Sequence, residues 1–322
     1  MNLLVTGGAG FIGSHFVLRH VGEYPKDNVV VLDKLTYAGD ESFLDPVKKS
    51  ITFVKGDIAD TPLVEKLIKE HAIDVIVDFA AETHVDRSID DPFPFLHTNV
   101  LGVQSLIEVC RKNPSLKLLH VSTDEVYGDL KDGDAPKKIT DPLFPSSPYA
   151  ASKAAGDFLV QSAMRTYGIK AIISRCTNNY GPHQATEKFI PTVIRTASVD
   201  QPVPIYAQGQ NKRDWLYVTD HTDAIEVLLQ TKDLFERSSS ESCIYHVSAD
   251  SEKKNIDVAK LLLKILGKPE SLLTSVKDRP GHDWRYALDS SRMRKLGWSP
   301  KVSFEEGLRK TVEWYRRRKE GS

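Results

Sequence analysis

The stretch Thr6-Gly7-Gly8-Ala9-Gly10-Phe11-Ile12-Gly13 lies near the start of the chain, directly after the apolar run Leu3–Val5. An amphipathic pattern follows it, so we expect a turn from a strand into a helix. There Gly7 permits a tight turn, Gly10 lets the backbone approach a pyrophosphate, and Gly13 lets the helix pack on the strand. The first helical N–H groups, at Phe11 and Ile12, favour an anion. The stretch predicts a dinucleotide-binding loop; the alternative is a glycine turn without a ligand.

Outward from this loop, the first half of the chain alternates short apolar strands with amphipathic helices, which is typical of a parallel sheet. We expect an α/β fold: a Rossmann-type, doubly wound parallel sheet of about seven strands, with a smaller C-terminal substrate-binding domain. The alternation weakens after residue 175, and a strand-helix-strand pattern returns at about 215–245. We therefore assign residues 1–175, joined again by about 215–245, to the dinucleotide domain and the rest of 176–322 to the substrate domain. The expected strands are Leu3–Thr6, Val29–Leu32, Thr52–Lys55, Val75–Phe79, Lys117–Ser122 and Lys170–Arg175. The expected helices are Ile12–Val21, Pro62–His71, Pro92–Asn113, Pro148–Tyr167, Ile256–Leu266 and Phe304–Arg317.

Composition excludes several classes of protein. The 43 basic and 44 acidic side chains nearly cancel, so no dominant basic field favours a nucleic acid or a membrane surface. No segment approaches the ~18 apolar residues of a membrane span, and the first strand begins too early for a signal peptide. Cys110, Cys176 and Cys243 are widely spaced without ligand-like neighbours, so we interpret them as reduced core thiols and expect no metal. We expect a cytoplasmic protein.

The residue that ends the predicted second strand indicates whether NAD or NADP is bound. Asp33 lies about twenty residues after the glycine loop, where a carboxylate accepts hydrogen bonds from the adenosine ribose and repels a 2′-phosphate. This favours NAD over NADP, although the following residue, Lys34, weakens the preference.

Three further positions are candidates for contact with the cofactor. Asp57-Ile58 follows the third strand and is placed to meet the adenine, with a plain turn carboxylate as the alternative. Ala80-Ala81 ends the fourth strand with small side chains, so the backbone can approach the dinucleotide. Asn99 lies in the next helix, where its amide either holds a water, orients Lys153, or is purely structural.

A second motif carries the chemistry. Tyr149 and Lys153 are four residues apart, so on a helix they share one face, and the ammonium is expected to lower the pKa of the phenol. Such a phenol acts as a base near neutral pH. Thr123 is followed by the acidic pair Asp124-Glu125, which can move protons on carbon and oxygen. Together with a dinucleotide loop, these residues predict oxidation, elimination and reduction on one substrate; the alternatives are an acidic surface turn and an ordinary helix surface.

These motifs resemble the extended short-chain dehydrogenase/reductase family, and within it the nucleotide-sugar 4,6-dehydratases. The resemblance covers nearly the whole chain, and the Asp-Glu pair after Thr123 is its discriminating part, because related sugar epimerases and decarboxylases normally lack that pair. The stretches that carry it are Gly7–Gly13, Ala80–Ser88, Ser122–Gly128, Tyr149–Lys153, Asn178–Pro182, Glu187-Lys188, Arg213–Trp215 and Asp278–Asp283. The chain departs from the family at residues 183–186, where an aromatic residue and a proline are common.

The resemblance implies a nucleoside diphosphate hexose as substrate, with dTDP-glucose expected. It implies that Tyr149 takes the C4 hydroxyl proton while hydride moves to NAD, with Thr123 on the same oxygen and Lys153 on the nicotinamide ribose. Glu125 would abstract the C5 proton and a protonated Asp124 would release the C6 hydroxyl as water. Hydride then returns to C6, so NAD is regenerated and is expected to stay tightly bound.

The resemblance also marks residues for binding the substrate and a surface for self-association. The substrate positions that it implies are Thr83, His84, Asn179, Glu187, Lys188, Arg213 and Arg279. His84 is equally well explained as a structural histidine. The helices predicted at Pro92–Asn113 and Pro148–Tyr167 carry more apolar residues than one face needs and resemble helices that pair in a homodimer.

Two kinds of rival function remain open from the sequence. The first is another nucleotide-sugar enzyme, either a 4,6-dehydratase of UDP- or GDP-sugars or an NAD-dependent 4-epimerase. The second is a non-catalytic NAD-binding protein, which would need none of Thr123, Tyr149 and Lys153.

Overall fold

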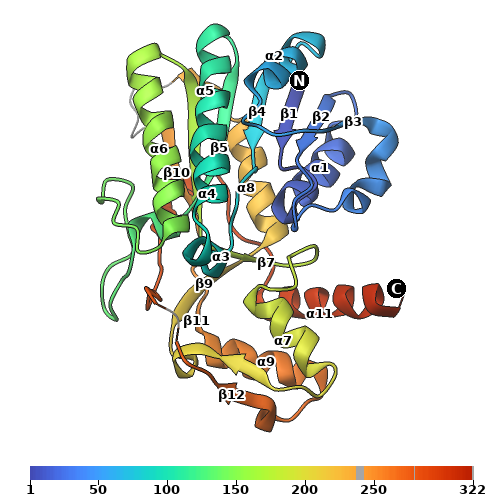
Figure 1. The fold of residues 1–322 in the computed structure, drawn as a ribbon, viewed down its shortest axis with the longest axis vertical. Helices are drawn as coiled ribbons and strands as arrows, with labels where there is room; N and C mark the ends of the chain where they lie inside the picture. Colours follow the sequence, from blue (N-terminus) through green and yellow to red (C-terminus); the bar gives the residue numbers. More distant parts are fainter. Residues whose placement is uncertain (237–242, 279, 321–322) are drawn as a thin grey trace.

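Seven parallel strands form the central sheet of the computed structural model, which describes residues 1–236, 243–278 and 280–320 (Figure 1). The strand order is β10-β6-β5-β4-β1-β2-β3, the doubly wound order of a Rossmann sheet extended by one strand. The predicted fold class is therefore confirmed. The strands are β1 (Asn2–Thr6), β2 (Asn28–Asp33), β3 (Ile51–Lys55), β4 (Val75–Asp78), β5 (Lys117–Thr123), β6 (Lys170–Cys176) and β10 (Ile244–Val247).

Helices cover both faces of this sheet because its strands are apolar on both sides. Leu3 and Val5 of β1 pack with α1 and α8 on one face, whereas Leu4 packs with α2, α5 and α6 on the other. All three side chains are fully buried, so the two-residue repeat of the strand divides the core into two layers. The helices are α1 (Phe11–Glu23), α2 (Thr61–Glu70), α5 (Val103–Lys112), α6 (Pro148–Tyr167) and α8 (Val218–Gln230).

The helix predicted over Pro92–Asn113 is divided in the structure. A short α4 (Phe93–Leu96) leads into the π-helical segment η2 (His97–Gly102) before α5 begins. Asn99 is buried within the π-helical turn, and a wider turn of this kind commonly marks a functional position.

A second, smaller body lies beyond the carboxyl ends of the strands, in the lower part of Figure 1. Its apolar core joins residues of α7, α9 and α11, including Ile194, Leu262 and Leu308. It contains a three-stranded sheet of order β11-β9-β7 and a two-stranded pair of β12 and β8. Its elements are β7 (Asn178–Tyr180), α7 (Phe189–Ala197), β8 (Val203–Ile205), η4 (Tyr206–Gly209), β9 (Lys212–Tyr217), β11 (Glu252–Lys254), α9 (Asn255–Leu266), η7 (Glu270–Leu272), β12 (Leu273–Ser275) and α11 (Phe304–Glu320).

The chain passes between the two bodies more than once. After β9, which pairs with β7 and β11, α8 packs against α1 and β10 pairs with β6 of the central sheet. The remaining short elements are η1 (Glu41–Ser50), α3 (Val85–Asp90), η3 (Asp124–Tyr127), η5 (Leu234–Glu236) and α10 (Ser291–Lys295). Across the three described stretches, no helix has the length and apolarity that crossing a membrane requires.

Two glycines of α1 test how tightly the first turn is packed. A Cβ on Gly13 would stand 2.2 Å from the Gly7 carbonyl oxygen, whereas a Cβ on Gly22 meets nothing within 4 Å. We expect Gly13→Ala to lower the free energy of unfolding by about 1–3 kcal/mol through overpacking. Gly22→Ala, the matched control, should raise it by up to about 1 kcal/mol through helix propensity. Denaturant unfolding of both variants measures the difference, and equal stabilities would contradict this packing.

Candidate active site

The glycine loop joins β1 to α1 and packs against the end of β4. Gly7 has a φ of +66°, and a Cβ there would stand 2.7 Å from the backbone nitrogen of Ala80. Gly10 caps the N-terminus of α1 without any side-chain hydrogen bond. The N–H groups at the start of α1 therefore remain available to an anion, and the glycines leave room for it to reach them. These features fit the pyrophosphate of a dinucleotide.

A cleft runs along the carboxyl edge of the sheet from this loop. It brings together cofactor residues predicted from separate strands, namely Gly7, Gly10, Asp33, Lys34, Asp57, Ile58, Ala80 and Ala81. The sequence reasoning missed further lining residues, namely Thr36, Ala38, Gly39 and Thr98. Thr36, Ala38 and Gly39 follow the end of β2, so their position after a parallel strand was the signal that pointed to them.

Asp33 is held by two backbone groups. Its carboxylate oxygens accept hydrogen bonds from Ala9 N at 2.9 Å and from Leu35 N at 2.8 Å. Burial nevertheless raises the pKa of Asp33, because these two bonds only partly offset the loss of water. Lys34 turns to Asp57, with Nζ 2.6 Å from Oδ2, so its charge is already paired.

The catalytic candidates gather where β5 ends. Thr123 is the last residue of that strand, and its Oγ1 donates to Asp124 Oδ1 at 3.1 Å and accepts from Glu125 N at 3.3 Å. Asp124 is buried at 2% exposure. Burial raises the pKa of Asp124 well above its usual range, and the neighbouring Glu125 carboxylate raises it further. The environment of Asp124 thus favours the protonated form of its carboxyl group.

Tyr149 and Lys153 lie one turn apart on α6, both buried. Burial raises the pKa of Tyr149 well above its usual range, the Glu125 carboxylate adds to this, and a hydrogen bond with Thr123 opposes it. Burial and Glu125 thus dominate the Tyr149 pKa in this arrangement, and the predicted lowering by Lys153 stays a prediction. Lys153 Nζ instead donates to the carbonyl oxygen of Val121 at 2.8 Å.

Asn99 links two elements that border the site. Its Nδ2 donates to Glu82 O at 3.0 Å and to Ser152 Oγ at 2.9 Å, while its Oδ1 accepts from Glu82 N at 3.0 Å. Asn99 therefore ties the segment that follows β4 to Ser152 of α6, one residue before Lys153. Of the alternatives raised by the sequence, these bonds match the structural one.

The predicted substrate residues at 83–84 and 187–188 meet across the two bodies. Lys188 Nζ donates to Thr83 O at 2.7 Å, and His84 Nε2 lies 3.8 Å from Glu187 Oε1. Glu187 also accepts from Arg87 Nη2 at 2.8 Å. Sequence reasoning missed the role of Arg87, although this residue lies within the motif that carried the resemblance.

Asn179 and Arg213 are engaged by the protein itself. Asn179 Oδ1 lies 2.9 Å from His221 Nδ1, and its Nδ2 donates to Thr177 O at 2.9 Å. Arg213 Nη2 donates to Asp283 O at 2.9 Å. The guanidinium of Arg213 lies 4.4 Å from the centre of the Tyr286 ring, and its charge opposes the rise in the Asp124 pKa. Tyr286 was not identified from the sequence, and Arg279 lies outside the described residues.

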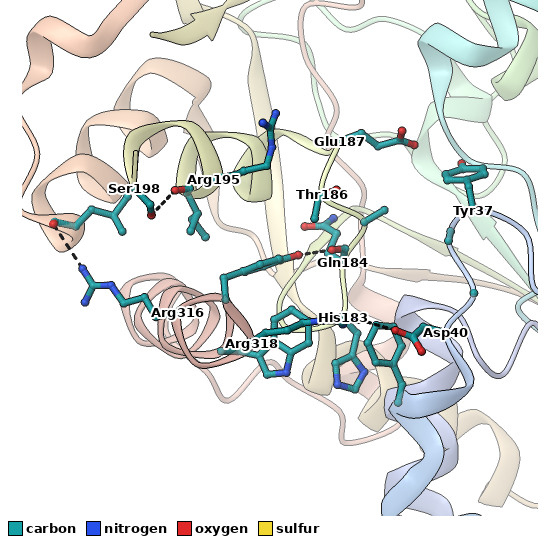
Figure 2. Close-up of a pocket in the computed structure, with 18 of the residues that line it drawn as sticks. Tyr37, Asp40, His183, Gln184, Thr186, Glu187, Arg195, Ser198, Arg316 and Arg318 are labelled. Carbon is teal, nitrogen blue, oxygen red and sulfur yellow. Dashed lines mark hydrogen bonds and ion pairs between the residues drawn. The ribbon is translucent and has the colours of Figure 1, made fainter. Parts of the chain in front are cut away.

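A separate cavity of about 920 Å³ opens between the two bodies (Figure 2). Residues 183–186, where the sequence departs from the family, line it together with Glu187, the Tyr37–Asp40 loop, α7 and the end of α11. It shares Ala38 and Gly39 with the cofactor cleft but contains none of the catalytic candidates. Burial lowers the pKa of His183 to about 3, so this histidine is neutral. The cavity lies beside the reaction site and does not enclose it.

The residues that the structure describes contain no set of side chains arranged as metal ligands. Within them, no group of three or more His, Cys, Asp or Glu side chains could hold a metal ion. Cys110, Cys176 and Cys243 are free and buried. Burial raises the pKa of the Cys110 and Cys176 thiols to about 12, so these two are protonated at neutral pH.

Comparison with known proteins places this geometry among nucleotide-sugar enzymes. A family model described as GDP-mannose 4,6 dehydratase matches residues 4–311. The dTDP-glucose 4,6-dehydratase of Mycobacterium tuberculosis is 46% identical over 319 residues, covering 98% of this chain and 93% of the relative. The crystal structure of a dTDP-glucose 4,6-dehydratase from Streptomyces venezuelae with NAD bound has a TM-score of 0.93 and 43% identity, covering 100% and 98% of the two chains. A UDP-glucose 4-epimerase of Thermus thermophilus in complex with NAD has a TM-score of 0.88 and 32% identity, covering 98% and 99%.

The raised pKa of Asp124 makes a prediction about stability. Above the unfolded-state pKa of about 3.9 the unfolded chain releases this proton while the folded protein keeps it, so rising pH disfavours the fold. Asp124→Asn removes this effect and should raise Tm by on the order of a few degrees at about pH 8 but far less at about pH 4. Calorimetry at both pH values measures the difference.

The matched control for this measurement is Asp45→Asn, because Asp45 is exposed in η1. Its change in Tm should be small and similar at both pH values. If Asp124→Asn gave the same change in Tm at both pH values, Asp124 would not be a protonated acid in the folded protein.

Proposed function

This chain belongs to the GDP-mannose 4,6-dehydratase family, and we propose that it is an NAD-dependent dTDP-glucose 4,6-dehydratase. The observation that carries the proposal is the Asp124-Glu125 pair at the end of β5, beside Thr123 and Tyr149. A dehydratase needs an acid and a base on adjacent carbons of the sugar in addition to a redox pair. The related dTDP-glucose 4,6-dehydratases match nearly the full chain, which supports the choice of nucleotide.

The cofactor cleft supports NAD. Gly7, Gly10 and Gly13, with the N–H groups of Phe11 and Ile12, would hold the pyrophosphate, and Asp33 would bind the adenosine ribose. Asp57, Ile58 and Lys34 would border the adenine, and Ala80 and Ala81 would border the nicotinamide half. When bound, NAD accepts a hydride from the sugar and returns it, so the enzyme needs no external oxidant.

The first step requires removal of the C4 hydroxyl proton. Tyr149 Oη is the base that we assign to this proton, with Thr123 Oγ1 as a hydrogen-bond partner of the same oxygen. Because burial and Glu125 raise the Tyr149 pKa, the phenol starts protonated and needs added positive charge to act as a base. Lys153, one turn away on α6, supplies one such charge.

The elimination step uses the acidic pair in two different states. Oxidation at C4 acidifies the C5 hydrogen, and we assign the Glu125 carboxylate to abstract it. Asp124 keeps its proton because it is buried beside Glu125, so it can protonate the C6 hydroxyl as water leaves. Reduction at C6 and return of a proton to C5 complete the 4-keto-6-deoxy sugar.

We assign the diphosphate and nucleoside to the residues that face the gap between the two bodies. Arg213 lies close enough to Asp124 for their charges to interact. When the sugar is bound beside Asp124, the guanidinium of Arg213 can therefore form hydrogen bonds with the diphosphate attached to that sugar. Asn179, Lys188 and Glu187 would bind further along the substrate, bordered by Thr83 and His84, and Arg279 is assigned through its motif alone.

The activity is tested with the purified protein and three substrates: dTDP-glucose, UDP-glucose and GDP-mannose. We expect dTDP-glucose to lose one water, detected by mass spectrometry, without consumption of added NAD. The other two should react at least tenfold more slowly, because a missing base contact costs about 1.4 kcal/mol or more. Inversion at C4 without loss of water would instead identify a 4-epimerase.

The matched control for this assay is the Asp124→Asn, Glu125→Gln double variant. It should bind NAD and still oxidise C4, but eliminate water at least ~100-fold more slowly, because both proton transfers are impaired. Bound NADH, followed by its absorbance, should accumulate. Full dehydratase activity in this variant would contradict the assigned roles.

We also propose that the chain forms a homodimer through α6 and the continuous α4–η2–α5 region. These helices pack on each other and expose the large apolar side chains of Phe93, Leu101 and Phe158, at 76%, 58% and 56%. Light scattering of the wild type should give twice the chain mass of 36.0 kDa. The Leu101→Glu, Phe158→Glu variant should be monomeric, whereas Phe144→Glu, which changes an 81% exposed residue outside these helices, should not. A monomeric wild type would contradict the proposal.

A further inference from the structure

The ammonium of Lys153 is buried among charges that the proposed mechanism does not use. Lys153 is 3% exposed, and its Nζ donates to the carbonyl oxygen of Val121 at 2.8 Å. Asp157 follows Lys153 by one helical turn and faces the same strands of the sheet. A lysine so deeply buried tends to lose its proton unless carboxylates compensate.

Two buried carboxylates bracket a histidine beneath this lysine. Asp78 of β4 and His120 of β5 are paired in register, and His120 Nδ1 lies 2.7 Å from Asp78 Oδ2. On its other side, His120 Nε2 lies 3.8 Å from Asp157 Oδ1. All three side chains are at most 1% exposed. The outer ends of this row are held by Thr6, which donates to Asp78 at 2.6 Å, and by Arg175, which donates to Asp157 at 2.7 Å.

Burying two carboxylates costs far more free energy than burying two apolar side chains. We therefore expect the row formed by Asp78, His120 and Asp157 to have a function. Burial opposes ionisation of Asp78, but the hydrogen bond from His120 and the Lys153 charge outweigh it and lower the pKa of Asp78. Reciprocally, burial lowers the pKa of Lys153 while Asp78 and Asp157 raise it. Lys153 and Asp78 therefore stabilise each other's charged forms.

We propose that Asp78 and Asp157, spaced by His120, are positioning residues that keep the Lys153 ammonium charged and in place one turn from Tyr149. The hydrogen bonds of Asp78 go to Thr6 and His120 and that of Asp157 goes to Arg175, so both carboxylates act on the site through Lys153. The inference rests on the proposed function, because the Lys153 charge matters for turnover only if Tyr149 is the base. The titratable or charged groups around Lys153 are Asp78 on β4, His120 on β5, Arg175 and Cys176 on β6, and Tyr149 and Asp157 on α6.

The sign of the expected effect follows from these charges. Removing a carboxylate removes a contribution that raises the Lys153 pKa, so the ammonium loses its proton at lower pH. Asp78→Asn keeps the shape of the side chain and removes the charge. The alkaline limb of its kcat profile should move to lower pH, with a loss of roughly tenfold or more near pH 9 and a much smaller loss near pH 7.

The test combines this profile with a direct reading of the lysine. kcat for dTDP-glucose is measured from about pH 6 to about pH 10 for wild type, Asp78→Asn and Asp157→Asn, with bound NAD quantified in each. Lys153 is followed by NMR of the lysine Nζ in labelled holoenzyme, assigned with Lys153→Met. In wild type the ammonium should persist at neutral pH, and in both variants its titration should move to lower pH.

The matched control is Tyr127→Phe, which removes a buried hydroxyl bonded to Arg175 and to His246 while leaving every charge of the row. It should lower stability without moving the alkaline limb. A lower kcat in Asp78→Asn at unchanged pH dependence, or a wild-type Lys153 that is neutral at pH 7, would overturn the proposal. Should the variants fail to fold, the wild-type NMR titration decides it alone. A wild type that turns over no nucleotide sugar would overturn the proposed function instead, since the NMR reading needs no substrate.

Discussion

The parallel direction of the central strands is the constraint on which the site depends. Because every strand in the sheet runs the same way, all their carboxyl ends open on one edge. Gly7 follows β1, Asp33 ends β2, Ala80 follows β4 and Thr123 ends β5. The strand order β5-β4-β1-β2 places each of these positions one strand spacing from the next along that edge. Residues more than a hundred positions apart in the sequence thus lie at the same edge of the sheet without any additional structural element.

Burial then decides the protonation state of each group at that edge. The same loss of water favours the neutral form of Asp124, of Tyr149 and of Lys153, although one of these must be charged for the phenol to act. Nearby charges modify this effect: Asp78 and Asp157 oppose the lowering of the Lys153 pKa, whereas Glu125 adds to the rise in the Asp124 pKa. Asp124 and Glu125 are neighbours in sequence but lie in different environments, because only Asp124 is fully buried.

Local sequence patterns predicted the fold because they report local physics. The glycine spacing at Gly7–Gly13 and the apolar strand runs depend only on backbone freedom and side-chain period. The Rossmann sheet and the family are confirmed, and solved structures of relatives with NAD bound support the choice of NAD. The pKa shifts were harder to predict from the sequence. The direction of the Tyr149 shift depends on burial and on Glu125, and the four-residue spacing of Tyr149 and Lys153 contains no information about either. The π-helical turn around Asn99 and the pairing of Glu187 with Arg87 arise from contacts between distant segments. The substrate residues were marked by resemblance alone, and their roles stay predictions.

The contacts of those substrate residues imply that binding is an exchange of partners. Lys188 already donates to Thr83 O, and Glu187 already accepts from Arg87, so both links tie the α3 region to the segment before α7. A substrate that recruits Lys188 must replace a hydrogen bond that the protein makes to itself. The net gain from that contact is therefore small, on the order of the difference between two hydrogen bonds. We propose that selectivity depends instead on groups whose internal partners are backbone carbonyls held in place by the fold. Arg213, which donates to Asp283 O, is such a group. An arginine held in this way presents its remaining N–H donors in a fixed direction. This favours binding of a diphosphate that lies in that direction over binding of a carboxylate at another position of the sugar.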